Sequence, residues 1–350
     1  MKTELSKKSN SNKLSKLAVG TVQFGQDYGV SNQEGRPSEK NIRRILDLAS
    51  SSGITVLDTA PAYGQAERVI GRMLSSPNNF KIITKTCALY GLSSAQSPST
   101  AILQTFEQSL SRMNIDKTYG LIVQLPDDLL GTKGDEVWKT LEDIKSDGSS
   151  TLIGASCYRV VEVLEILNRY PIDLIQLPFN IFDQELLSSG LLTNLNKRGI
   201  KVHTRSTFLQ GLLLMDFKSL PENFTRAEPP LKKFNKMAKL NQLSRLELAL
   251  RFVSSVQGID NIVIGVTKIR ELEDIISTIK IPLSSSIKTS QLRTEDKAVK
   301  TPSLWPPDTK DKWRFDFSVK KINVKGCPNS LQFSGLAPPK KLVVVISPVA

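Results

Sequence analysis

The chain has 350 residues, of which 39% are hydrophobic, and its formal net charge is +13. This length accommodates one large core or two ordinary domains. Residues 1–16 and 281–350 hold 11 of the 13 excess positive charges, whereas a nucleic-acid enzyme more often carries a basic face on its folded body. We therefore expect no nucleic-acid partner. Solvated tails are the simplest interpretation of the two ends, and weak contact with an anionic surface is the alternative.

The cysteine content and the length of the apolar runs indicate where in the cell the protein is located. Cys87, Cys157 and Cys327 are too few and too scattered for a disulfide framework, and none lies in a CxxC pair. This usage is typical of a reducing environment. No run of about 18 apolar residues would span a membrane, and residues 1–16 lack the apolar centre of a secretory signal. We expect a cytoplasmic protein without a membrane span.

Eight β-rich runs alternate with amphipathic helical stretches from residue 17 onward. They are continuous apolar runs, as expected for parallel strands that are covered on both faces. The intervening stretch "PSEKNIRRILDLASSSG" has Ser38 as a helix N-cap and Gly53 as its stop. Eight such repeats predict a (β/α)8 TIM barrel. The runs are LAVGTV (17–22), ITVLD (54–58), KIITK (81–85), YGLIV (119–123), TLIGA (151–155), DLIQL (173–177), IKVHT (200–204) and NIVIG (261–265).

A doubly wound sheet is the alternative fold. It requires a GxGxxG turn after the first strand, and "GTVQFGQDYG" does not supply one. We therefore assign residues 17–283 to the barrel and residues 1–16 to a basic N-terminal tail. Residues 284–350 form a Lys- and Pro-rich extension, which we expect to add no strand to the barrel. Its last run, "KKLVVVISPVA", is β-like and has no partner that the sequence identifies.

Three residues with complementary chemistry follow the second and third predicted strands. Asp58 ends the second strand, Tyr63 lies in the loop after it, and Lys85 ends the third. The C-terminal ends of barrel strands share one mouth, so these side chains converge. A neighbouring ammonium lowers the pKa of a phenol, and a carboxylate holds that ammonium charged and oriented. Each residue alone is more often structural, but the trio predicts a proton donor for a carbonyl whose carbon receives a hydride.

The segments that carry these residues resemble a known family. "LDTAPAYGQAERVIGRML" is similar to the aldo-keto reductase signature, and "FKIITKT" resembles the segment with the catalytic Lys of that family. The resemblance covers about residues 17–283 and implies a (β/α)8 barrel that binds NADP(H) without a Rossmann fold. NAD(H) is the alternative cofactor. Carried over, Asp58, Tyr63 and Lys85 are three of the four catalytic residues of the family.

Further segments imply contacts to the cofactor. "IGASCY" and "IQLPFNIFD" resemble the segments whose Ser and Gln, here Ser156 and Gln176, contact the nicotinamide amide. "IGVTKIRELEDII" resembles the last βα loop, which holds the adenosine phosphate. The cofactor candidates are Thr21, Asp58, Ser156, Gln176, Arg205 and Lys268.

Two groups of residues have less certain roles at the cofactor. Lys268, with Arg270 two residues on, favours NADPH through its 2′-phosphate, although both are also ordinary charges for a helix start. Arg205, Ser206 and Gln210 lie after the seventh strand, where a loop approaches either the pyrophosphate or the substrate. No metal site is predicted.

The fourth catalytic position departs from the family pattern. The strand "YGLIVQLPDD" ends in Gln124, where the family normally has His. An amide N–H donates a hydrogen bond to a developing oxyanion, but it neither becomes cationic nor passes a proton. The single histidine, His203, ends the seventh strand. It either reaches the mouth as a replacement or, as we favour, has a structural role.

Two functions remain open from the sequence. The first is an NADP-dependent oxidoreductase that acts on a small carbonyl or a sugar-like alcohol. The second is a catalytically attenuated NADP-binding regulatory or scaffold protein. Gln124 supports the second function, whereas Asp58, Tyr63 and Lys85 oppose it because a pure binding protein requires none of them.

Overall fold

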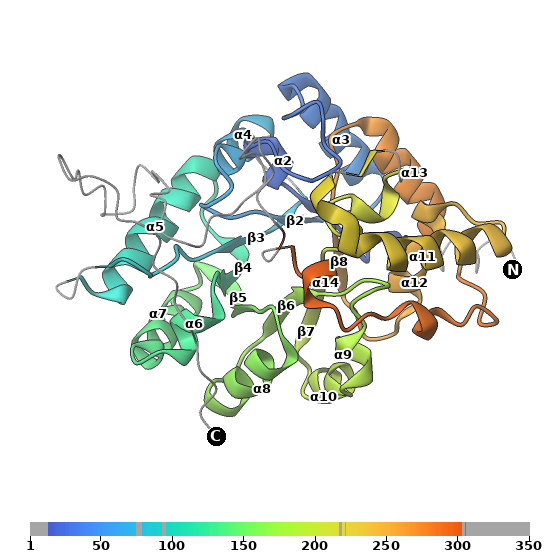
Figure 1. The fold of residues 1–350 in the computed structure, drawn as a ribbon. Coiled ribbons are helices and arrows are strands. Elements are labelled where there is room, and N and C mark those ends of the chain that lie inside the picture. Colours follow the sequence, from blue (N-terminus) through green and yellow to red (C-terminus); the bar gives the residue numbers. More distant parts are fainter. Residues whose placement is uncertain are drawn as a thin grey trace, which may run out of the picture.

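The computed structural model describes residues 13–74, 79–92, 96–216, 219–220, 222–302 and 305. Among these residues, eight parallel strands pair in sequence order and close into a barrel through the pairing of β1 with β8. Figure 1 shows the strands at the centre and the helices around them. The predicted TIM barrel is confirmed. The strands are β1 Leu17–Gly20, β2 Val56–Asp58, β3 Lys81–Lys85, β4 Thr118–Val123, β5 Ser150–Ser156, β6 Leu174–Pro178, β7 Lys201–Arg205 and β8 Asn261–Gly265.

The first predicted strand was too long. It ends at Gly20, because Thr21 is the N-cap of the short helix α2, Val22–Gly25. The helix predicted after it, α3, spans Glu39–Ser51, and the Ser38 hydroxyl accepts a hydrogen bond from the Asn41 N–H as expected. Within the described ranges, no helix is both long and apolar enough to cross a membrane. The longer helices are α4 Ala66–Met73, α5 Pro98–Met113, α7 Gly134–Ser146, α8 Val160–Arg169, α10 Leu191–Lys197, α11 Glu228–Leu240, α12 Arg245–Ser255 and α13 Ile269–Ile279; α6 Pro126–Leu130, α9 Glu185–Ser188 and α14 Lys297–Lys300 are shorter.

Side chains alternate between the inside of the barrel and the surrounding helices. Ala18, Val56, Ile83, Ile122 and Leu174 form an apolar cluster of their own inside the barrel. A larger apolar cluster fills the space between the strands and the helices. The interior cluster therefore fills the barrel below the level of the mouth.

The same alternation determines which polar side chains point into the mouth. Successive residues of a strand point to opposite faces, so residues two positions apart share a face. Two residues beyond members of the interior cluster lie Asp58, Lys85, Gln124 and Gln176. Four strands therefore deliver polar side chains into one mouth.

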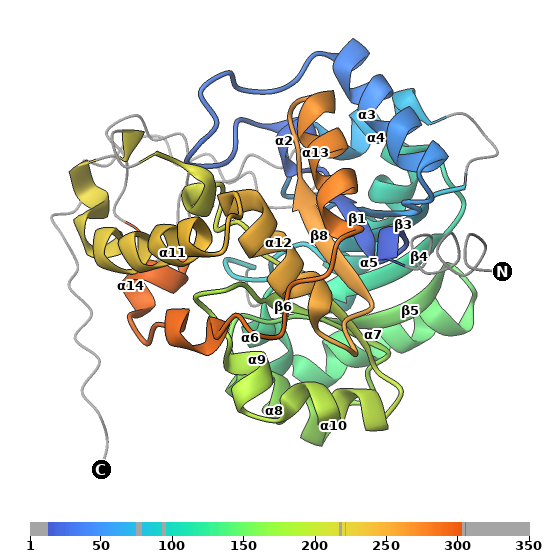
Figure 2. The same ribbon diagram turned by 90° about the vertical axis from the view of Figure 1, so that its right-hand side faces the viewer.

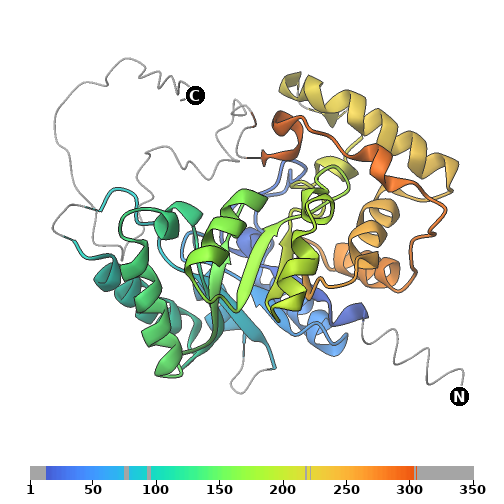
Figure 3. The same cartoon turned by 90° about the horizontal axis from the view of Figure 1, so that it is seen from below.

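The described part of the extension packs over the barrel without adding a strand. A 3-10 turn at Thr289–Leu292 precedes α14, and Leu292, Val299 and Trp305 are buried. Figures 2 and 3 show this orange-to-red segment beside α11. The Thr294 N–H donates to the Phe182 carbonyl (3.0 Å), which ties the segment to the loop after β6. Residues 1–12 and the β-like run at 340–350 lie outside the described residues.

Candidate active site

A cavity of about 1270 Å³ opens at the C-terminal ends of the strands. Its walls include Asp58, Tyr63, Lys85 and Gln124, so the structure brings together the four side chains that the sequence nominated. Among the described residues, no group of three or more His, Cys, Asp or Glu could hold a metal ion. The mouth presents carboxylate, phenol, ammonium and amide groups from Asp58, Tyr63, Lys85 and Gln124.

Asp58 and Lys85 form an ion pair in the floor of the cavity. Lys85 Nζ lies 2.9 Å from Asp58 Oδ1 and 3.0 Å from Oδ2, and it also donates to the Thr59 carbonyl (2.9 Å). Lys85 is only 2% exposed and Asp58 only 3%. Burial lowers the pKa of Lys85 below its ordinary value, although the Asp58 carboxylate opposes this shift. Both acceptors and the enclosure hold the ammonium in one place.

Tyr63 lies above this ion pair. Lys85 Nζ is 5.0 Å from the centroid of the Tyr63 ring. Burial of the hydroxyl, followed by the negative charge of Asp58, raises the pKa of Tyr63 well above its ordinary value. The pKa of Tyr63 is therefore raised overall, whereas the sequence led us to expect a lowered pKa. The enclosure disfavours a phenolate, and the negative charge of Asp58 adds to this effect.

The loop that carries Tyr63 is fixed from two sides. A side chain at Gly25 would place its Cβ 1.8 Å from the Tyr63 carbonyl oxygen, so only glycine allows this approach of α2. On the other side, the buried Glu67 carboxylate accepts hydrogen bonds from Thr84 Oγ1 (2.8 Å) and Arg112 Nε (2.8 Å). These contacts attach the start of α4 to β3 and α5, so the phenol keeps its position over Lys85.

Gln124 and His203 occupy different places. Gln124 is 7% exposed, lines the cavity and has a buried Oε1 atom with no hydrogen-bond partner among the described residues. His203 is fully buried beside Gln176 in the strand register, and it does not line the cavity. Its ring nitrogens have no partner among the described residues, and burial lowers its pKa to about 4. His203 is thus a neutral interior residue at pH 7, and Gln124 is the side chain that β4 presents at the mouth.

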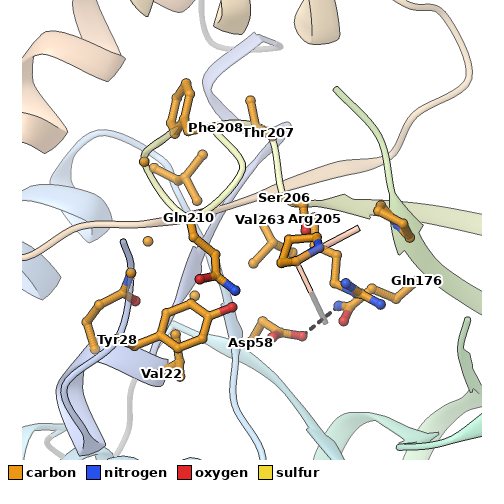
Figure 4. A pocket seen from close by; sticks show the side chains of 18 of the residues that line it. Val22, Tyr28, Asp58, Gln176, Arg205, Ser206, Thr207, Phe208, Gln210 and Val263 are labelled. Carbon is orange, nitrogen blue, oxygen red and sulfur yellow. Dashed lines mark hydrogen bonds between the residues drawn. The ribbon is translucent and has the colours of Figure 1, made fainter. Parts of the chain in front are cut away.

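All six cofactor candidates line the same cavity: Thr21, Asp58, Ser156, Gln176, Arg205 and Lys268. Ser206 and Gln210 also line it, whereas Arg270 does not. Gln176 Nε2 donates to Asp58 Oδ2 (2.7 Å), a cross-barrel contact that the sequence did not reveal. Figure 4 shows this hydrogen bond.

Two tyrosines were missed from the sequence. Tyr28, in the loop after α2, points into the cavity toward Gln210 (Figure 4). Tyr158, after β5, stacks under Arg205, whose guanidinium carbon is 4.4 Å from the ring centroid. Arg205 Nη2 also donates to the Cys157 carbonyl (3.1 Å). Their position in loops after strands is the signal that could have identified them, because such loops form the mouth of a barrel.

The barrel and its mouth match a known family. A family model described as "Aldo/keto reductase family" matches residues 16–289. The chain belongs to the aldo/keto reductase family. Its relatives are oxidoreductases, and members of this family bind NAD(P)H; the chain is an enzyme of the same class.

Individual aldo/keto reductases are distant relatives. Aldo-keto reductase YhdN of Bacillus subtilis (strain 168) is 26% identical over 286 residues, which are 74% of this chain and 83% of YhdN. The L-glyceraldehyde 3-phosphate reductase of Escherichia coli (strain K12) is 25% identical over 267 residues, 66% of this chain and 77% of the relative.

Solved aldo/keto reductases share the fold. The holo form of aldo-keto reductase AKR11C1 from Bacillus halodurans has a TM-score of 0.64 at 22% identity and covers 80% of this chain and 92% of that one. The glycerol dehydrogenase AKR11B4 from Gluconobacter oxydans has a TM-score of 0.62 at 22% identity, with 84% and 94% covered. At these identities, the likeness supports the barrel and not a substrate.

Proposed function

We propose that this aldo/keto reductase is an NADP-dependent oxidoreductase that interconverts a small carbonyl compound and its alcohol, with Tyr63 as the proton donor. The observation that carries the proposal is the buried Asp58–Lys85 ion pair beneath the Tyr63 ring, in the floor of an open cavity. A protein that only binds a nucleotide needs no buried ion pair under a phenol. The arrangement therefore does not favour a regulatory or scaffold role.

The cavity offers groups that fit a nicotinamide carboxamide. Gln176 Nε2 is engaged by Asp58, while its Oε1 atom is buried without a partner among the described residues. Such an acceptor suits the N–H donors of a carboxamide, since an unpaired buried acceptor is costly. The neighbouring Ser156 is 2% exposed, and its hydroxyl can donate to the carboxamide oxygen. Thr21 supports the site indirectly, because its hydroxyl donates to the Asp58 carbonyl (2.9 Å).

The nicotinamide, when bound, supplies or accepts the hydride. In the reductive direction, Tyr63 donates its proton to the carbonyl oxygen as that oxygen gains negative charge. The raised pKa of Tyr63 keeps the phenol protonated at neutral pH, so the donor is ready before the reaction. Lys85 faces the ring from 5.0 Å and stabilises the phenolate that remains until solvent reprotonates it. Gln124 orients the carbonyl by an amide N–H hydrogen bond.

NADPH is proposed as the preferred cofactor because Lys268 lines the cavity from the loop after β8. A charge-assisted hydrogen bond to a phosphate contributes about 1.5–3 kcal/mol, which is roughly one to two decades in affinity. NADH, which lacks the 2′-phosphate, would lose this contact.

The proposal also covers location and partners. Cys87 and Cys157 are buried thiols that take part in no disulfide among the described residues, and this usage supports the proposal of a reducing, cytoplasmic location. We propose a small-molecule substrate and no nucleic-acid partner; any contact of the basic ends with an anionic surface remains a secondary proposal.

The test is a fluorescence titration with NADPH and NADH, followed by NADPH consumption over a panel of aldehydes, ketones and sugars. Tight NADPH binding and turnover that is lost in Tyr63→Phe support the proposal. Tight NADPH binding with no turnover on any carbonyl, even after Gln124→His, would favour the regulatory role. An active Tyr63→Phe variant would contradict the assigned proton donor.

A further inference from the structure

An ion pair joins two loops that lie far apart in the sequence. Glu34 lies in the loop between α2 and α3, which is drawn in blue in Figure 2, and Lys268 is the N-cap residue of α13. Lys268 Nζ donates to Glu34 Oε1 across 234 residues of sequence. Both residues line the large cavity. The pair therefore links the loop that follows β1 to the loop that follows β8 at the cavity wall.

The loop presents Glu34 from an ordered backbone. Asn32 Oδ1 accepts hydrogen bonds from the N–H groups of Glu34 (3.1 Å) and Gly35 (3.0 Å). Asn32 Nδ2 donates to the carbonyls of Tyr28 (3.2 Å) and Gly35 (3.0 Å). Because Asn32 fixes the backbone on both sides of Glu34, the carboxylate is held near Lys268.

Two carboxylates, those of Glu34 and Glu271, act on the Lys268 ammonium. The Glu271 carboxylate accepts from the N–H groups of Thr267 (2.7 Å) and Lys268 (3.2 Å), and Asp274 lines the cavity one turn later. The Glu34 carboxylate raises the pKa of Lys268, with a smaller contribution from Glu271, so the ammonium is fully charged. A phosphate that approaches Lys268 must therefore enter beside Glu34.

We propose that Glu34 is a specificity-determining residue that competes with the 2′-phosphate of NADPH for Lys268. This inference rests on the proposed function, because it requires the cofactor to occupy the cavity. The phosphate dianion repels the Glu34 carboxylate, so NADPH must displace or weaken the ion pair. NADH carries no phosphate and leaves the pair intact. Glu34 thus reduces the difference in affinity between NADPH and NADH that Lys268 alone would create.

The ion pair is weak enough to be opened by a ligand. The side chains of Lys268 and Glu34 are 50% and 68% exposed. Exposed ion pairs of this kind contribute little to stability, because solvent screens them and both side chains lose freedom. Removing Glu34 should therefore leave the fold intact and change only the charge that faces the phosphate.

The test measures dissociation constants for NADPH and NADH in Glu34→Gln. We expect NADPH to bind about fivefold more tightly, which corresponds to the upper range for an exposed pair, and NADH to change by less than about twofold. The gain should shrink at high salt because exposed charges are screened. Glu39→Gln is the matched control: Glu39 pairs with Arg72 at 53% and 52% exposure and does not line the cavity. It should leave both constants unchanged.

A double variant separates competition from a general effect of charge. If Glu34 acts through Lys268, Glu34→Gln should leave the NADPH constant of Lys268→Met unchanged. An unchanged NADPH/NADH ratio in Glu34→Gln would overturn the inference alone. Equal weakening of both cofactors would also overturn it, since this result assigns the ion pair a structural role. Failure of the parent protein to bind either cofactor would instead refute the proposed function.

Discussion

Replacing Lys85 with Met should leave the Asp58 carboxylate buried without its cation. The substitution removes three hydrogen bonds, to Asp58 Oδ1 (2.9 Å), Asp58 Oδ2 (3.0 Å) and the Thr59 carbonyl (2.9 Å). Breaking a buried pair by removing one partner destabilises a protein by about 3–5 kcal/mol. Gln176 Nε2 still donates to Asp58 Oδ2 at 2.7 Å, so we expect the lower end of this range.

The assay is chemical denaturation of the parent, Lys85→Met and the double variant Asp58→Asn/Lys85→Met. The double variant removes both charges, so its free energy of unfolding should exceed that of Lys85→Met. A Lys85→Met variant as stable as the parent would refute the argument that the carboxylate depends on this ammonium. A double variant less stable than Lys85→Met would refute it too, because the loss would then come from packing.

Four further results are expected. Tyr63→Phe should lower kcat by about 10²- to 10⁴-fold. Gln124→Ala should lower kcat less, because a neutral hydrogen-bond donor contributes less than the proton source. A larger loss in Gln124→Ala than in Tyr63→Phe would contradict these roles. Gln124→His should raise the rate of reduction of simple aldehydes about tenfold. A lower rate in Gln124→His would show that the Gln124 amide suits the substrate of this enzyme better than an imidazole does. Because burial raises the pKa of Tyr63, the rate of carbonyl reduction should stay constant up to about pH 9. The rate of alcohol oxidation should rise with pH, because this direction needs the phenolate. A decline of the reduction rate near pH 7 would contradict this. Lys268→Ala should weaken NADPH binding about ten- to a hundredfold and leave NADH unchanged, and an unchanged ratio would remove Lys268 from the phosphate site.

The barrel and much of its mouth could be predicted because both follow from local patterns. Strands covered on both faces are continuous apolar runs, and their C-terminal ends share one mouth, so Asp58 and Lys85 could be paired from the sequence. The error at Thr21 arose because an apolar run does not reveal where the backbone turns into α2.

Other properties of the mouth depend on distance and burial. The pKa of Tyr63 rises because its hydroxyl is enclosed and the negative charge of Asp58 lies near it. The spacing of residues in the sequence does not reveal this enclosure. The Gln176–Asp58 hydrogen bond joins residues 118 positions apart. Likewise, the sequence shows Glu34 only as a charged loop residue. Its contact with Lys268 becomes visible only in the folded structure.

The packed core of this enzyme extends beyond the segment that the family model matches. The family match ends at residue 289, yet Leu292, Val299 and Trp305 are buried and residues 297, 300, 301 and 302 line the cavity. A chain cut at residue 289 would expose apolar surface and open the entrance at the same time. Relatives that share the barrel therefore need not admit the same molecules, because one wall of this entrance is built from sequence that the shared family pattern does not reach.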